Sequence, residues 1–198
     1  MIGIIDYHLN NLRSVQKAFE KVGAEAFISD DPSALARADK LLLPGVGAIG
    51  QAMQNLHELK LDSIVRAHVD AGRPLMGICL GMQLLFTRSD EGGGYDGFGF
   101  LRGEVKQFPM SVKVPHIGWN QIDVCASSPL LRGVADHSFV YFVHSFFPEP
   151  EEDVVLCTTD YALPFASVVQ KENVTGIQFH PEKSQTTGLQ MLANFAGV

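Results

Sequence analysis

The chain has 198 residues, 46% of them hydrophobic and 19% charged, which is enough apolar material for the buried core of one domain. Its formal net charge of -7 and the absence of a Lys/Arg run argue against nucleic acid or an anionic membrane surface as a partner. Small molecules and other proteins remain as candidates.

The N-terminus and the cysteines indicate where the protein works. The first residues run straight into a strand pattern without the basic and apolar regions of a secretory signal, and no apolar run reaches the ~18 residues that span a bilayer. Cys79, Cys125 and Cys157 include no close pair, which argues against a disulfide framework and a CxxC zinc site. We therefore expect a cytoplasmic protein with reduced thiols, in which the sequon at Asn173 is a chance match.

The first half of the chain alternates apolar runs with helical patterns. Strands are predicted over residues 2–5, 26–29, 40–43 and 75–78. A first helix ends at Gly23 and has an apolar face made of Leu12, Val15, Phe19 and Val22. A long second helix ends near residues 71–72 and has an apolar stripe made of Ile49, Met53, Leu56, Ile64 and Val65. A short helix runs through residues 83–86, and the alternation predicts a parallel sheet covered on both faces.

The second half consists mostly of short β-rich runs. They cover residues 105–108, 121–124, 139–143, 154–158, 166–170 and 174–179, and they predict antiparallel ribbons added to the main sheet. A closing helix has Leu189, Leu192 and Phe195 on its inner side. Because no repeat or linker composition interrupts the chain, we expect one α/β domain over residues 1–198.

A cysteine lies at a predicted strand-to-helix junction. Residues 77–81, GICLG, have the form GxCxG, the spacing of a nucleophile elbow at the carboxyl edge of a sheet. The helix N-terminus behind Cys79 favours a negatively charged sulfur. The alternative is a buried core cysteine at a tight turn, and this segment alone leaves both interpretations open.

A histidine and a carboxylate follow the last predicted strand. Residues two apart along an extended chain point to the same side, so His180 and Glu182 are expected to share a face. Pro181 places the pair at a strand end. A histidine oriented by a carboxylate is the general base that a thiol nucleophile needs, whereas the alternative is an ion pair on a surface turn.

Two further segments could contact a substrate beside Cys79. The loop of residues 43–48, LPGVGA, leaves a strand at the same edge, and its glycines would let backbone N–H groups turn toward an oxyanion. A plain strand-to-helix turn is the alternative. Gln83 shares a helix face with Cys79, where its amide could hold the polar end of a substrate or cap the backbone.

Two other patterns predict no site. Residues 92–97, GGGYDG, formally match GxGxxG but open no helix, so they indicate a flexible loop and no dinucleotide site. The histidines are scattered, and His57 and His68 lie in a helical pattern without metal-ligand spacing. We expect neither a metal nor a cofactor.

The motifs PGVGA, GICLGMQLL and GIQFHPEKS, in this order, resemble the class I (triad-type) glutamine amidotransferases over essentially the whole chain. The segments IIDYHLNNLRSV, KLLLPGVGAIG, VPHIGWNQI and YFVHSFF are similar to the glutaminase subunits of imidazole glycerol phosphate synthases, which serve histidine biosynthesis. The resemblance implies a flavodoxin-like, mostly parallel central sheet flanked by helices, with added antiparallel strands.

The resemblance also implies residue roles. Cys79 would attack the side-chain carboxamide of glutamine, His180 would transfer the proton to departing ammonia, and Glu182 would orient His180. Water would then hydrolyse the glutamyl thioester. The implied oxyanion donors are the backbone N–H groups of Gly45, Val46, Gly47 and Leu80, and the loop can require a flip before it acts. The implied glutamine-binding positions are Gly47, Leu80, Gln83, Ser145 and Phe146, the last of which is often tyrosine in relatives.

The implied partner is a cyclase subunit of the (β/α)8-barrel type that forms a heterodimer with this chain and receives ammonia through a tunnel at the interface. The residues implied at or near that interface are Asn11, Trp119, Tyr141 and Lys183. Glutaminase activity is expected to be low until the partner docks with its ligand.

The first loop departs from the family pattern. Many relatives have Asp-Tyr-Gly-x-Gly-Asn where residues 6–11 read DYHLNN, so His8 and Asn10 replace two glycines. Asn10 tolerates a positive φ, whereas His8 fits this backbone less readily. The departure leaves open a paralogous glutaminase that supplies ammonia to another synthase, for example in sugar amidation. A catalytically silent subunit is the third hypothesis, against which the intact Cys79, His180 and Glu182 argue.

Overall fold

The computed structural model describes residues 1–9 and 12–197. The expectations for Asn10 and Asn11 therefore concern residues outside the described part of the chain. Among the helices that the structure describes, none is long and apolar enough to cross a membrane.

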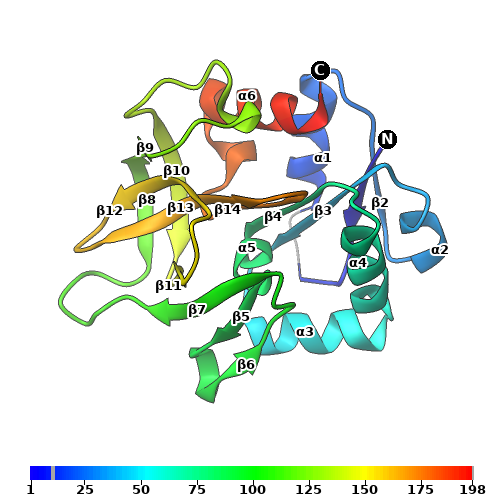
Figure 1. The fold of residues 1–198 in the computed structure, drawn as a ribbon, viewed down its shortest axis with the longest axis horizontal. Helices are drawn as coiled ribbons and strands as arrows, with labels where there is room; N and C mark the ends of the chain where they lie inside the picture. Colours follow the sequence, from blue (N-terminus) through cyan, green and yellow to red (C-terminus); the bar gives the residue numbers. More distant parts are fainter. Residues whose placement is uncertain (10–11, 198) are drawn as a thin grey trace.

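An eight-stranded sheet forms the centre of the molecule, in the order β2-β1-β3-β4-β14-β13-β12-β9 (Figure 1). Neighbouring strands from β2 to β14 pair in parallel, and those from β14 to β9 pair antiparallel. The strand bounds are β1 Ile2–Ile5, β2 Ala26–Ser29, β3 Lys40–Gly45, β4 Leu75–Cys79, β9 Asp123–Val124, β12 Val155–Asp160, β13 Pro164–Lys171 and β14 Val174–Ile177.

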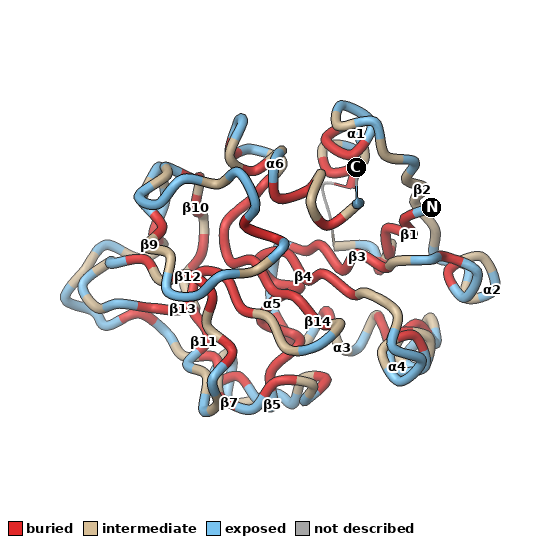
Figure 2. Tube along the Cα trace, turned by 45° about the horizontal axis from the view of Figure 1, so that its top comes forward, coloured by how far each residue is buried: buried red, intermediate tan, exposed pale blue. Residues whose placement is uncertain are grey.

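Helices cover both faces of the parallel half, because its strands are apolar on both sides. Ile4 belongs to one core cluster and the adjacent Ile5 to the other. Helices α1 (Leu12–Lys21) and α6 (Gln185–Ala196) bury their apolar residues in the first cluster. The second cluster contains the buried hydrophobic side chains of α2 (Pro32–Leu35), α3 (Ile49–Glu58), α4 (Leu61–Asp70) and α5 (Leu80–Leu84). Figure 2 shows the enclosed central strands as a continuous buried layer.

Two smaller sheets stand beside the central one. The first has the order β11-β7-β5-β6, with bounds Phe146–Pro150, Leu101–Gln107, Phe86–Ser89 and Tyr95–Asp96. The second is the antiparallel pair of β8 (His116–Gln121) and β10 (Phe139–His144). Three 3-10 turns complete the described elements: η1 Glu91–Gly93, η2 Pro129–Leu131 and η3 Pro181–Lys183.

The prediction of one long second helix was wrong. The chain breaks after α3, and Lys60 adopts a left-handed conformation with φ 58 before α4 begins. The apolar spacing nevertheless continues, because Leu56 and Leu61 are both fully buried in the same cluster. Apolar spacing reports which residues face the core, and here both halves of a bent segment face the same core.

Several smaller predictions also need correction. β14 pairs in parallel with β4 inside the central sheet and ends at Ile177, instead of forming an antiparallel ribbon to residue 179. The helix expected over residues 83–86 is α5, and Phe86 begins β5. Helix α2 was missed although its signals are present, since Pro32 stands in its first turn and the Asp31 side chain caps it by accepting from two backbone N–H groups.

The left-handed Lys60 generates a stability prediction. Lys60→Gly should raise the free energy of unfolding by about 0.5–1 kcal/mol, because glycine adopts a positive φ without a Cβ penalty. Lys17→Gly is the matched control at an exposed position inside α1, where glycine should cost about 1 kcal/mol. Urea denaturation measures both changes, and equal losses of stability would show that Lys60 lies in continuous helix.

Candidate active site

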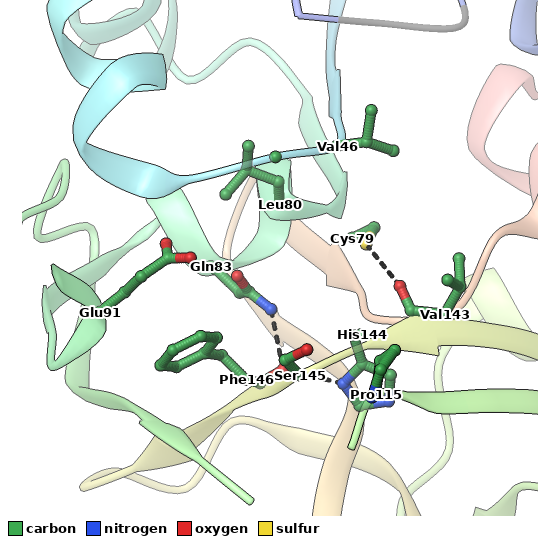
Figure 3. A pocket seen from close by; sticks show the side chains of 11 residues that line it. Val46, Cys79, Leu80, Gln83, Glu91, Pro115, Val143, His144, Ser145 and Phe146 are labelled. Atoms are coloured by element: carbon green, nitrogen blue, oxygen red, sulfur yellow. Dashed lines mark hydrogen bonds between the residues drawn. The ribbon is translucent and has the colours of Figure 1, made fainter.

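A cavity of about 300 Å³ opens at the carboxyl ends of β3 and β4. Its walls come from the loop after β3, the β4–α5 junction, η1, and the end of β10 with the start of β11 (Figure 3). The lining residues are Val46, Gly47, Cys79, Leu80, Gln83, Glu91, Pro115, Val143, His144, Ser145 and Phe146. The carboxyl edge of a parallel sheet is where open α/β folds bind ligands.

Cys79 ends β4 in a strained conformation, with φ 55 and ψ -109. The two flanking glycines make this turn possible. A Cβ on Gly81 would lie 1.6 Å from the Leu43 carbonyl oxygen, and one on Gly77 would lie 2.4 Å from the Gly81 carbonyl oxygen. Cys79 is 6% exposed and lines the cavity, so it is both nearly buried and presented to the site.

His180 and Glu182 contact each other outside the lining of this cavity, in a smaller neighbouring pocket that Val46 also lines. His180 Nδ1 lies 2.9 Å from Glu182 Oε1, and their side chains are 5% and 3% exposed. The expected proximity is confirmed, but its cause differs: His180 follows β14, and the η3 turn, not an extended strand, folds Glu182 back onto it. Since a carboxylate accepts, Nδ1 carries the proton and Nε2 is left for chemistry.

The charges around His180 favour its protonated form. Burial alone lowers the pKa of His180, but Cys79 and Glu182 together outweigh burial and raise it to about 10. His180 Nε2 makes no hydrogen bond to a described residue, and the thiol of Cys79 points at the Val143 carbonyl with Sγ and O 3.9 Å apart. The position of His180 beside Cys79 and Glu182 therefore favours an imidazolium.

The predicted oxyanion donors occupy different positions. Val46, Gly47 and Leu80 line the cavity, whereas Gly45 lies within β3 and does not. The Val46 N–H donates to the Leu9 carbonyl at 3.3 Å, so this donor is already engaged outside the cavity. A second hydrogen bond holds the start of the loop: the Tyr7 hydroxyl donates to the Pro44 carbonyl at 2.6 Å. In this conformation the predicted Val46 donor is not available to a ligand.

The five predicted glutamine-binding residues all line this cavity. Gln83 is buried, and its amide donates to the Phe146 carbonyl at 2.9 Å and to Gln178 Oε1 at 3.2 Å. The Phe146 carbonyl also accepts from His144 Nδ1 at 2.8 Å (Figure 3). This carbonyl therefore ties α5 to the β10–β11 junction.

Sequence reasoning missed several lining residues, among them Glu91 and His144. The Glu91 carboxylate accepts from the Ile49 N–H at 2.7 Å and so caps α3 from another part of the fold. The Tyr95 ring packs closely against Gly50 in the same turn of α3, where an added Cβ would lie only 2.5 Å from the ring. No local pattern marks Glu91, because its place depends on how the β5–β6 ribbon folds onto α3.

His144 and His116 form a buried pair behind the cavity. His144 Nε2 lies 3.1 Å from His116 Nδ1, and the ring of His116 stacks on Tyr161 with centroids 4.0 Å apart. Because His144 Nδ1 donates to a carbonyl, its Nε2 must accept, and His116 must donate. Burial lowers the pKa of His116 to about 4 and, as the largest influence, that of His144 to about 3. Both rings are neutral near pH 7.

Three of the predicted interface residues cluster on the outer side of the β8–β10 pair. Trp119 and Tyr141 are register partners with ring centroids 6.1 Å apart, and Lys183 Nζ lies 5.8 Å from the Tyr141 ring. Trp119 is 46% exposed. We call Trp119, Tyr141 and Lys183 the aromatic surface. The fourth predicted residue, Asn11, lies outside the described residues.

The departure at His8 is accommodated by the backbone. His8 takes a left-handed conformation with φ 66, as a glycine would, and its N–H donates to the Asp6 carboxylate at 3.0 Å. A local side-chain contact of this kind helps to hold a turn. The glycine-like shape of the first loop is thus kept at this position.

One group in the described chain has the spacing of metal ligands: Asp123, Asp136 and His137, all exposed. His137 Nδ1 lies 2.8 Å from Asp123 Oδ1, and Asp136 accepts from two backbone N–H groups. These contacts make an ion-paired surface turn, and we assign no metal to it.

The chain is similar to known proteins over nearly its whole length. A model of the family "Glutamine amidotransferase class-I" matches residues 4–197. The chain is 53% identical to the imidazole glycerol phosphate synthase subunit HisH of Aquifex aeolicus, covering 97% of this chain and 94% of that protein. It is 49% identical to HisH of Syntrophotalea carbinolica, covering 98% of each. A crystal structure of a glutamine amidotransferase superimposes with a TM-score of 0.78 at 19% identity, covering 100% and 99% of the two chains.

The buried histidine pair generates a prediction on acid stability. In the unfolded chain both histidines take up a proton below about pH 6.5, whereas the folded chain resists protonation of His116 until about pH 4. The free energy of unfolding should therefore fall between pH 6.5 and 4, by about 1 kcal/mol or more per pH unit. The raised pKa of His180 adds no slope there, since its stabilisation is complete below pH 6.5 and is lost only toward pH 10.

His116→Phe tests this origin, because it removes one titrating ring and keeps an aromatic stack. Urea denaturation at a series of pH values should show a shallower acid slope for this variant. His57→Gln, at an exposed histidine, should leave the slope as in the wild type. A slope unchanged by His116→Phe would contradict the assignment.

Proposed function

Because this chain belongs to the class-I glutamine amidotransferases, and within them to the HisH subunits of imidazole glycerol phosphate synthase, we propose that Cys79, His180 and Glu182 carry out its glutaminase chemistry. The protein is the glutaminase subunit of that synthase and hydrolyses L-glutamine. The observation that carries the residue assignment is Cys79 at a strained strand-to-helix turn, together with a buried His180–Glu182 pair whose Nδ1 and Oε1 are 2.9 Å apart and whose histidine is influenced by Cys79.

The first half of the reaction breaks the amide. The Cys79 thiolate attacks the side-chain carboxamide carbon, a C–S bond forms, and the C=O electrons move onto oxygen. Protonated His180 gives its Nε2 proton to the amide nitrogen, and the C–N bond breaks to release ammonia. Glu182 stays ionised and stabilises the imidazolium through Nδ1. The product on the enzyme is a glutamyl thioester.

The second half restores the cysteine. Neutral His180 takes a proton from water as the water oxygen bonds to the thioester carbon. Collapse of this tetrahedral intermediate returns the electron pair to sulfur and releases glutamate. Gly47 and Leu80 would donate backbone N–H groups to the oxyanion in both halves, and Val46 would join them once it leaves the Leu9 carbonyl.

The cavity offers complementary groups for the amino-acid end of glutamine. Both Nε2 hydrogens of Gln83 are engaged, so its Oε1 is the atom that remains to accept from a ligand. Glu91 is the acidic residue among the lining side chains and would face the α-ammonium group. Ser145 and the Phe146 ring would close the remaining side.

Membership of the synthase implies a cyclase partner, which we propose is a (β/α)8 barrel that receives the ammonia in a heterodimer. The aromatic surface supports docking, since Trp119 is 46% exposed, Tyr141 beside it is partly exposed, and Trp and Tyr are enriched at protein–protein interfaces. Transfer within the complex would keep ammonia from being protonated in water.

The two alternative hypotheses, a different synthase as the acceptor of ammonia and a catalytically silent subunit, are less favoured. The relatives named above are HisH subunits at about half identity over nearly the full chain, which favours the histidine pathway over sugar amidation. The complete triad argues against a silent subunit. We also propose that residues 1–198 form one domain, matched almost end to end by the family, and that the protein works in the cytoplasm, where its three free cysteines stay reduced.

Removing the nucleophile tests the assignment. Cys79→Ala should lower glutamine-dependent activity of the complex by about 10⁴-fold or more and leave its ammonia-dependent activity intact, because only the amide hydrolysis needs sulfur. Cys125→Ala, at the exposed cysteine, is the matched control and should keep both activities. Glutamine turnover by Cys79→Ala would show that another residue is the nucleophile.

The aromatic surface yields a separate test. The cyclase barrel with its bound ligand should stimulate glutamine hydrolysis, and Trp119→Ala should weaken the affinity between the subunits about tenfold or more, as at an interface hot spot. Titration of glutaminase activity with the cyclase measures this affinity. Met110→Ala, at a fully exposed side chain outside the aromatic surface, should change nothing. Equal titration curves for Trp119→Ala and the wild type would place the interface elsewhere.

A further inference from the structure

Gln178 is the first residue after β14 and stands two residues before His180, and it is 0% exposed. Its backbone is held by the N–H, which donates to the Ser167 carbonyl at 2.9 Å. Its side-chain amide spans two groups of the site. Oε1 accepts from Gln83 Nε2 at 3.2 Å, and Nε2 lies 3.8 Å from the sulfur of Cys79. The buried amide of Gln178 therefore has the sulfur of Cys79, the proposed nucleophile, as one of its partners.

The orientation of this amide follows from the atoms around it. The Phe146 carbonyl can only accept, so Gln83 must present its NH2 group there. The second hydrogen of that NH2 group points to Gln178, whose Oε1 must therefore accept the hydrogen bond. The NH2 group of Gln178 is thereby directed at Cys79 Sγ. If the Gln178 amide were flipped, its NH2 group would face the NH2 group of Gln83 inside the core, and neither group could accept a hydrogen bond.

A chain of hydrogen bonds from the β8–β10 pair also fixes the Phe146 carbonyl. His144 Nδ1 donates to Phe146 O, His116 donates to His144 Nε2, and the Asn120 amide lies 3.4 Å from His116 Nε2. Each member of this chain is restricted to one donor–acceptor direction by its neighbour. The buried network therefore runs from the β8–β10 pair to the catalytic sulfur.

We propose that Gln178 is a further catalytic residue of this site: its side-chain N–H donates to the sulfur of Cys79 and stabilises the thiolate. This role rests on the proposed function of Cys79 as the nucleophile.

The donor acts when sulfur is charged. In the thiol form the S–H of Cys79 points at the Val143 carbonyl, a contact that is lost with the proton. The Gln178 N–H remains, and its bond strengthens because the acceptor is now an anion. Before attack it raises the thiolate fraction. When the thioester intermediate collapses, the C–S bond breaks, the electron pair returns to sulfur, and the same N–H stabilises the developing charge.

The effect of Gln178 on the ionisation of Cys79 can be measured separately from the effects of the titratable groups around the sulfur. His180, with Glu182 behind it, supplies the cation of the ion pair. Burial, with a smaller contribution from Cys79, raises the pKa of Tyr7 far above its usual range, and burial keeps His144 neutral. Neither Tyr7 nor His144 changes charge between pH 5 and 9. A change in that range on substituting Gln178 therefore reports on the sulfur and its imidazolium partner.

The test measures the pH dependence of Cys79 alkylation by iodoacetamide, followed by mass spectrometry of its peptide, in the complex with the cyclase. Gln178→Met removes the donor at similar shape and should move the midpoint of alkylation upward by about one to two pH units. Glutamine-dependent kcat should fall about tenfold or more, with ammonia-dependent activity unchanged. Ser167→Ala, which removes another fully buried polar group on the neighbouring β13, should leave the midpoint in place.

Gln178→Leu is a second neutral variant without the donor, and it decides the matter if Gln178→Met does not fold. It should raise the midpoint about as far. An unchanged midpoint in a folded Gln178→Met or Gln178→Leu complex would overturn the proposal. Alkylation needs no glutamine turnover, so this failure is distinct from failure of the proposed function, which would appear as glutamine hydrolysis by Cys79→Ala.

Discussion

The close approach of the β4–α5 turn to β3 is the constraint on which the site depends. Cys79 takes a positive φ that a non-glycine residue rarely adopts, and the turn leaves no room for a side chain at Gly77 or Gly81. Strand β4 itself is paired in parallel on both sides, with β3 and β14, and is completely buried. The strain at the cysteine is therefore held by a buried strand that is paired on both sides.

The same strand pairings bring the groups that we propose for proton transfer toward the sulfur. β14 pairs in parallel with β4, so the residues that follow it leave the sheet at the same edge as Cys79. Gln178 comes first, with its amide toward the sulfur, and His180 follows with Glu182 behind it. A two-residue interval along the chain thus supplies a neutral donor and a cation to one sulfur. Burial lowers the pKa of His180, but Cys79 and Glu182 outweigh burial and raise it to about 10.

The β8–β10 pair connects the site with the surface. Along β10, buried residues alternate with partly exposed ones, so Phe142 and His144 face inward whereas Tyr141 faces the aromatic surface. His144 is linked to the other cavity-lining residues through the Phe146 carbonyl, and the Tyr141 carbonyl accepts from the His180 N–H at 2.9 Å. A partner that contacts Trp119 and Tyr141 would press on a ribbon whose other side carries part of the active site. This short physical path suits a subunit whose chemistry must serve a partner.

The sequence by itself determined the α/β class, most strands of the parallel sheet and the chemical identity of Cys79, His180 and Glu182, because glycine spacing, apolar runs and short motifs are local properties. It could not determine the break at Lys60, the parallel placement of β14, or the cap that Glu91 gives to α3, since each depends on contacts between distant segments. The same holds for the direction of the Gln178 amide, which is set by Phe146 and Gln83 from two other elements. Local sequence specifies which groups can react, but hydrogen-bond direction is a property of the packed neighbours, and only the tertiary structure supplies those.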